Sequence, residues 1–181
     1  MPETHVPSCL PWFALKVRTR GELLVAESLR HRGPEIFLPT YLELRRYSDR
    51  IKKTPAALFP GYLFCRIDPA NRLPILTAPG VEHFVGAGNN PVPIPDSEIT
   101  AIQRVAESGA AAIPWPYIEA GHRIRIEYGA LAGLEGLVAQ VRGSDRLILS
   151  VHLLQRSVCV EIDRSWIRPL STSRTREGWS S

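Results

Sequence analysis

Alternating hydrophobic and polar positions mark the first regular segment of the chain. In residues 12–18, the side chains of Phe13, Leu15 and Val17 fall on one face of an extended backbone, which predicts a half-buried strand. Residues 22–32 then carry apolar side chains at helical spacing, which predicts an amphipathic helix. The chain therefore opens with a strand followed by a helix.

Residues 33–109 continue this mixed pattern. Residues 35–44 are rich in strand-forming side chains, and residues 61–67 are almost continuously apolar, as in a central strand that is buried on both faces. A short strand is predicted over residues 81–85, and a helix follows that Gly109 ends. We expect an α+β domain with a mostly antiparallel sheet flanked by helices.

A second unit follows a segment rich in small residues and proline. Strict alternation recurs in residues 123–127, 147–153 and 158–162, and glycines separate these runs. About five short strands in roughly fifty residues predict a small five-stranded β-barrel. The expected organisation is a first domain at 9–109, a linker at 110–119, a barrel domain at 120–170 and a disordered tail at 171–181.

Composition narrows the class of protein. The net charge of +4 is mildly basic, which permits a nucleic-acid partner without requiring one. No apolar run approaches the roughly 18 residues of a membrane-spanning helix, and we expect no membrane partner. The three cysteines are widely spaced and odd in number, so a reducing cytoplasm fits them best.

Catalytic patterns are weak. Cys65 lies within the apolar run 61–67, which favours a buried, inert thiol. The five histidines form neither an HxxxH nor an HExxH pattern, so we expect no metal site. We therefore expect no catalytic residue, no cofactor and no enzymatic activity.

Several segments together resemble the NusG family of transcription elongation factors. In the first domain these are the strand that begins at Trp12-Phe13, the stretch 59–64 (FPGYLF) and the stretch 78–86 (APGVEHFVG). In the second, residues 129–138 (GALAGLEGLV) resemble the glycine-bearing KOW motif, and residues 153–163 resemble the closing strands of its barrel.

The resemblance implies an NGN domain that binds elongating bacterial RNA polymerase, followed by a KOW domain. Family members suppress pausing, and specialised paralogues act as antiterminators on particular operons. The run 153–158 (LLQRSV) is more similar to the UpxY-type specialised paralogues than to the general factor. A ribosome- or RNA-binding KOW protein is the alternative, although such proteins are usually far more basic.

The resemblance also implies a polymerase-binding surface. In the family, the surface formed by the stretch that corresponds to residues 59–64 receives the tip of the polymerase clamp coiled coil. Aromatic side chains suit such anchor positions. The alternative is that these side chains belong to the core. A second contact, with the polymerase gate loop, falls on Asn71 and Arg72, where the sequence departs from the Thr-rich motif of one branch. The expected polymerase-binding residues are Phe59, Pro60, Tyr62, Phe64, Asn71 and Arg72.

Basic side chains form a second candidate surface. Residues 45–53 hold five basic residues against one acid, and two arginines follow the first strand. We expect these groups to lie beside upstream or non-template DNA and to contact phosphates without sequence readout; a solvated loop is the alternative. The expected nucleic-acid-binding residues are Arg18, Arg20, Arg45, Arg46, Lys52 and Lys53.

The KOW domain raises a question of fold, because some relatives refold it into a helical hairpin that covers the polymerase site. β-branched side chains at Val158, Val160 and Ile162 favour strands, so we expect a barrel that leaves the site uncovered. Leu154 would then be available to Rho or a small-subunit ribosomal protein, or it would be packed inside the barrel; both interpretations stay open.

Overall fold

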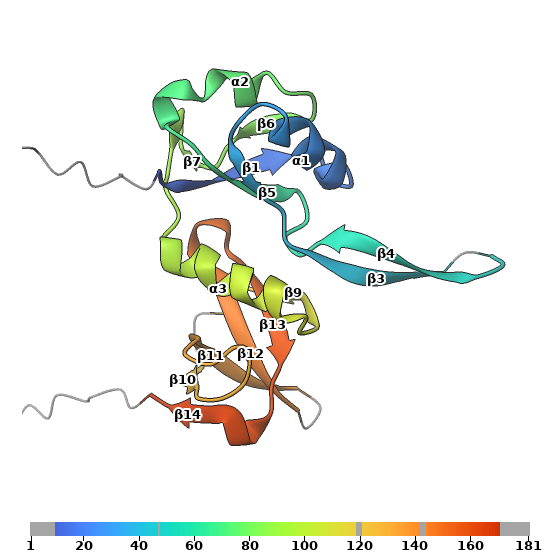
Figure 1. Ribbon diagram of the computed structural model, residues 1–181, viewed down its shortest axis with the longest axis vertical. Coiled ribbons are helices and arrows are strands. Elements are labelled where there is room, and N and C mark those ends of the chain that lie inside the picture. Colours follow the sequence, from blue (N-terminus) through green and yellow to red (C-terminus); the bar gives the residue numbers. More distant parts are fainter. Residues whose placement is uncertain (1–9, 47, 119–120, 142–143, 171–181) are drawn as a thin grey trace, which may run out of the picture.

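The computed structural model describes residues 10–46, 48–118, 121–141 and 144–170. Two β-sheets form separate layers, and helix α3 (Asp96–Ser108) lies between them (Figure 1). All of the strand pairings in these residues are antiparallel. They belong to two larger sheets and to two separate two-stranded sheets. The predicted α+β class is confirmed.

The first sheet has the strand order β2-β5-β1-β6. The central pair is in register from Trp12 opposite Arg66 to Lys16 opposite Tyr62. Helix α1, the short α2 and a 3₁₀ turn, η1, accompany this sheet. The elements are β1 (Trp12–Val17), α1 (Glu22–Arg30), β2 (Glu35–Phe37), β5 (Tyr62–Arg66), η1 (Pro69–Asn71), α2 (Leu73–Leu76) and β6 (Val81–Phe84), with the small ladder β7 (Gly86–Ala87) and β8 (Asn90–Pro91) after them.

Both faces of this sheet are buried, each in a different hydrophobic cluster. Phe13 and Leu15 of β1 pack with the buried side chains of α1 and α2, whereas Trp12 and Ala14 of the same strand belong to a cluster that reaches into the C-terminal sheet. The prediction that β1 is half-buried was therefore wrong. Periodicity identified one buried face, but it could not identify the distant elements that cover the other.

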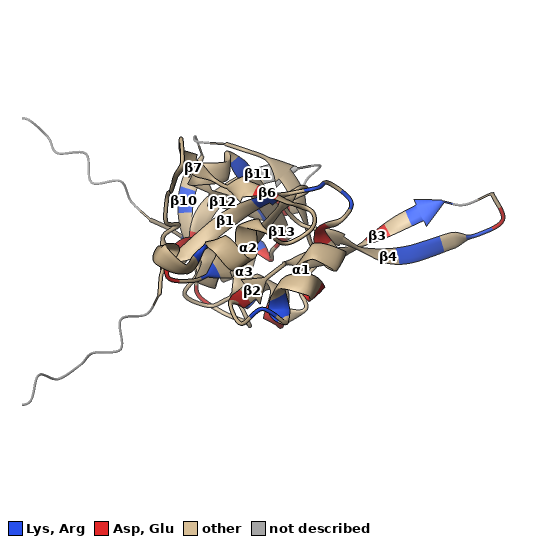
Figure 2. Ribbon diagram, turned by 90° about the horizontal axis from the view of Figure 1, so that it is seen from above, with Lys and Arg blue, Asp and Glu red and all other residues tan. Residues whose placement is uncertain are grey.

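Strands β3 (Thr40–Arg46) and β4 (Ile51–Ala57) form a long hairpin that extends away from the rest of the protein (Figures 1 and 2). Their register runs from Thr40 opposite Ala57 to Arg46 opposite Ile51. Figure 2 shows Lys and Arg positions along the outer part of both strands. The basic segment found in the sequence is thus carried on a β-ribbon.

The C-terminal sheet contains six strands in the order β14-β10-β11-β12-β13-β9, where five were expected. The additional strand is β9 (Ala112–Pro116), which pairs with β13 and lies inside the predicted linker 110–119. Its two prolines are tolerated because β9 is at the edge of the sheet. The other strands are β10 (His122–Ile126), β11 (Glu135–Val141), β12 (Ser144–Val151), β13 (Arg156–Glu161) and β14 (Ile167–Pro169), with 3₁₀ turns η2 (His152–Leu154) and η3 (Arg164–Trp166).

Helix α3 is attached to the C-terminal sheet by polar contacts as well as by packing. The Glu98 carboxylate lies 2.7 Å from Nδ1 of His152 and accepts the backbone N–H of the same residue. Arg104 donates to the carbonyl oxygen of Ala132 at 2.5 Å. Gly109 ends the helix in the left-handed conformation, with φ 71°, and the chain continues directly into β9. The predicted domain boundaries remain a prediction; the tail 171–181 lies outside the described residues.

Candidate functional site

The aromatic face, by which we mean Phe59, Pro60, Tyr62 and Phe64, is built by the turn between β4 and β5 and by β5 itself. The rings of Phe59 and Phe64 meet edge to face, with centroids 5.4 Å apart. Gly61 adopts φ +80°, a conformation that suits glycine and that turns the chain between these rings. The sequence motif therefore folds into one compact aromatic group.

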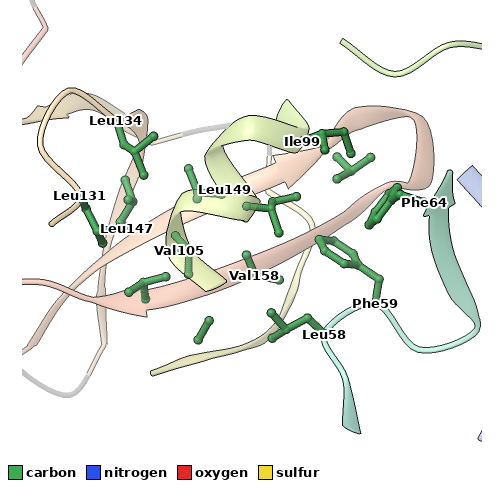
Figure 3. Packing of buried hydrophobic residues seen from close by; sticks show 14 of the residues in the cluster. Leu58, Phe59, Phe64, Ile99, Val105, Leu131, Leu134, Leu147, Leu149 and Val158 are labelled. Atoms are coloured by element: carbon green, nitrogen blue, oxygen red, sulfur yellow. The ribbon is translucent and has the colours of Figure 1, made fainter. Parts of the chain in front are cut away.

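This group is covered. Phe59 is 1% exposed and Phe64 is fully buried, and both belong to the cluster that contains α3 and the C-terminal strands. In Figure 3 the two rings are neighbours, with Leu58 next to Phe59 and Ile99 of α3 nearby. Phe59 and Phe64 are therefore core residues, the alternative that the sequence left open, and the expectation of an uncovered site does not hold for these two side chains. Tyr62 is half-buried and Pro60 is exposed, so the rim of the face remains accessible.

Two residues that the sequence analysis missed position this turn. The buried carboxylate of Glu22 accepts the N–H of Gly61 at 2.7 Å, and Nζ of Lys16 lies 4.5 Å from the ring centroid of Tyr62. An acid in the first turn of a helix is usually explained by the helix dipole, so Glu22 carried no distinctive signal. Lys16 is the strand partner of Tyr62, which alternation alone could not reveal.

Asn71 and Arg72 are not part of this face. They belong to the segment of η1 and α2, whose buried residue Ile75 packs in the other hydrophobic cluster, with Leu63 and Cys65. Phe64 points to the opposite side of β5 from Leu63 and Cys65. The aromatic face and the segment of Asn71 and Arg72 therefore lie on different faces of the first sheet.

Three of the expected nucleic-acid-binding residues line one depression at the base of the hairpin. Arg20, Arg45 and Arg46 surround it together with Tyr41, and its volume is about 650 Å³. Arg20 has φ 68°, a left-handed conformation that is uncommon outside glycine. Burial raises the pKa of Tyr41, and the nearby Glu43 carboxylate adds to this shift. Arg18, Lys52 and Lys53 are exposed outside the depression.

The segment of the C-terminal domain that includes Leu154 is β-structured, as predicted. Residues 147–162 contain most of β12 and β13, and no helix longer than the single turn η2 interrupts them. Leu154 lies in η2, is only 7% exposed and belongs to the shared cluster. Of the two interpretations, the structure supports the packed one.

The described residues bear on cysteine reactivity, metal binding and membrane insertion. Burial raises the pKa of the Cys65 thiol to about 12, which keeps it protonated and unreactive at neutral pH. Within the described parts of the chain, no three His, Cys, Asp or Glu side chains are grouped so that they could hold a metal ion. Among the helices of the same residues, none has the length and apolar character to cross a membrane.

The α+β unit with its aromatic face and basic hairpin, followed by a six-stranded antiparallel sheet, has the architecture of a NusG-type transcription factor. The family model described as "Transcription termination factor nusG" matches residues 10–103, which is more than half of the chain. The chain belongs to this family.

Curated relatives agree along almost the whole length. The chain is 27% identical over 175 residues to a transcription termination/antitermination protein NusG of Helicobacter pylori, covering 89% of this chain and 99% of that protein. It is 29% identical over 170 residues to the protein of that name from Escherichia coli O6:H1, covering 86% and 94%. A solved structure described as "Domain interaction in Thermotoga maritima NusG" has a similar fold, with a TM-score of 0.56, 20% sequence identity, and coverage of 89% of this chain and 97% of that one.

Proposed function

We propose that this transcription elongation and antitermination factor binds elongating RNA polymerase through the aromatic face and suppresses pausing or termination, on specific operons rather than on all genes. The observation that carries the proposal is the grouping of Phe59, Tyr62 and Phe64 around the Pro60-Gly61 turn. The clamp coiled coil of the polymerase is the expected partner. Large aromatic side chains are the residues that most often dominate such contacts.

Phe59 and Phe64 are buried in a cluster that they share with α3 and the C-terminal sheet. Polymerase binding through these two side chains would therefore require the cluster to open. The shared cluster is apolar, so separation exposes hydrophobic surface that the coiled coil would cover again. Tyr62 and Pro60, at the accessible rim, would make the first contact.

The basic residues would bind nucleic acid at the same time. Arg20, Arg45 and Arg46 around the depression, with Arg18, Lys52 and Lys53 outside it, present positive charge to upstream or non-template DNA. Such contacts supply affinity that depends on salt and not on base sequence. They would hold the hairpin near the DNA once the polymerase is bound.

The remaining assignments follow from this role. We place the protein in the cytoplasm, with no catalytic residue and no cofactor. Rho or a small-subunit ribosomal protein would bind the KOW domain near Leu154. Because Leu154 is buried in the cluster shared with the first domain, that partner would also require the domains to separate.

Two measurements test the proposal. Purified full-length protein is added to assembled elongation complexes and, separately, to ribosomal subunits; we expect binding to the former, with read-through of a pause or terminator. Binding to ribosomal RNA alone would favour the alternative, an RNA-binding KOW protein. Chromatin occupancy of the tagged protein then separates the roles, because a specialised factor occupies a few operons and a general factor occupies most transcribed genes.

A further inference from the structure

The exposed face of the β3–β4 hairpin is apolar. Leu42, Leu44 and Ile51 are 66%, 65% and 62% exposed. Cross-strand pairing puts Leu42 opposite Pro55, Leu44 opposite Lys53 and Arg46 opposite Ile51, and directly paired residues share a face of the ribbon. All six of these residues are exposed.

The other face of the ribbon mixes polar and apolar residues and is partly buried near the base of the hairpin. Glu43 and Thr54 form one of its pairs, and both are half-buried, as are Tyr41 and Ala56 in the neighbouring pair. A solvated hairpin normally turns its polar face to water and its apolar face to the protein. Exposed aliphatic side chains on a ribbon that extends away from the rest of the protein (Figure 2) form the kind of apolar surface that marks a partner site.

Charge identifies the partner as an anion. Arg46 and Lys53 share the apolar face, and Arg45 and Lys52 form the adjacent pair on the other face of the ribbon. Phosphate contact alone would explain Arg46, Lys52 and Lys53, whereas Arg45 already pairs with Glu43 at 2.9 Å. Phosphate contact leaves the three exposed aliphatic side chains without a role. A partner that offers negative charge on either side of an apolar surface would contact both the cations and the aliphatic side chains.

We propose that the face formed by Leu42, Leu44, Arg46, Ile51, Lys53 and Pro55 enters the major groove of duplex DNA. This inference deepens the nucleic-acid contact of the proposed function. The groove is about 12 Å wide and admits a two-stranded β-ribbon. Leucine and isoleucine side chains would pack on the C5-methyl groups of thymine, the apolar element of the major groove, while the cations reach phosphates.

Single-stranded DNA fits this face less well. Proteins that hold single strands stack the bases on aromatic rings, and Leu42, Leu44 and Ile51 offer no ring. The half-buried Tyr41 belongs to the opposite face of the ribbon. The shape of the ribbon and the aliphatic character of its exposed face therefore favour the duplex.

The test measures binding of the full-length protein to two duplexes, one of alternating A·T pairs and one in which uracil replaces thymine. Replacing thymine with uracil removes the C5-methyl groups and leaves the base pairing and the phosphates unchanged. We expect wild-type protein to bind the thymine duplex several-fold more tightly, with the preference lost in the double variant Leu44→Asn, Ile51→Asn. That variant should bind the thymine duplex roughly tenfold more weakly than wild type, with the same salt dependence.

Leu24→Asn is the matched control, because Leu24 is a 75% exposed leucine on α1, outside the hairpin; it should bind DNA like wild type. Equal binding of wild type to both duplexes, with an unaffected double variant, would overturn the inference. Loss of binding to anionic phosphatidylglycerol vesicles in the double variant, with DNA binding intact, would also overturn it. Either result leaves polymerase binding through the aromatic face untouched, since that is measured separately with Tyr62 variants.

Discussion

The buried carboxylate of Glu22 accepts the backbone N–H of Gly61 at 2.7 Å and so ties α1 to the turn that carries the aromatic face. A buried N–H group that is left without its acceptor lowers the stability of the folded state by about 1–3 kcal/mol. We expect Glu22→Ala to lower the free energy of unfolding by that amount, measured by urea denaturation. Glu27→Ala, an exposed acid on the same helix, is the control and should have little effect. Equal stability of the two variants would mean that Glu22 does not hold the turn.

Tyr62→Ala should weaken binding to elongation complexes while the protein remains folded, because Tyr62 is half-buried at the rim of the aromatic face. Truncation of an aromatic anchor typically costs about 2 kcal/mol or more, which is roughly thirtyfold in affinity. Titration of labelled protein onto elongation complexes measures this. Wild-type affinity in Tyr62→Ala would place the polymerase site elsewhere.

Phe59→Ala is expected to act on stability as well as on binding. Phe59 is almost fully buried in the cluster shared with α3, and truncation of a buried phenylalanine costs about 3–5 kcal/mol. A thermal melt should show a lower Tm than that of Tyr62→Ala. If Phe59→Ala melts like wild type, the side chain is not packed as described.

Charge reversal at Arg45, Arg46, Lys52 and Lys53 tests the electrostatic contact. Each phosphate contact contributes about −0.9 to the slope of log K against log salt on duplex DNA. We expect the fourfold variant to bind elongation complexes more weakly and with a shallower slope than wild type. An unchanged slope would show that these side chains are only a solvated face.

The Cys65 thiol gives a prediction about pH. Its pKa is raised by burial from 9.0 to about 12, so the folded state favours the neutral thiol. This contribution to stability is fully present below pH 9 and is lost as the pH rises toward 12. In a Cys9→Ser chain at pH 8, a thiol reagent should label Cys65 only after denaturation. Rapid labelling of the native protein would contradict the burial.

Local sequence patterns predicted those secondary-structure elements that are determined mainly by nearby residues in the sequence. The strands β1 and β5, the helix α3 and the β structure of residues 147–162 follow from hydrophobic period and from β-branched side chains. Pro114 and Pro116 suggested a linker because proline is poor in central strands. The same residues are acceptable in an edge strand, and pairing with β13 depends on residues forty positions away.

The candidate site was harder to predict, because its burial also depends on residues that are distant in the sequence. The motif at 59–64 identified the aromatic face, but Phe59 and Phe64 are buried in a cluster that includes residues of α3 and of the C-terminal sheet, which no local pattern connects to the motif. Alternation could also not tell which face of the hairpin is turned outward. Only the register of β3 and β4, with the exposure of each side chain, shows that the outward face carries Leu42 and Leu44.

The most direct test of polymerase binding through the aromatic face is photo-cross-linking from position 62. The full-length protein carries p-benzoylphenylalanine in place of Tyr62 and is bound to an elongation complex before irradiation, with the same group at the exposed position of Leu24 as the control. We predict a cross-link from position 62 to the clamp coiled coil of the polymerase, and none from position 24. Cross-links from position 62 that form only within the protein's own chain, while the complex is intact, would contradict the account.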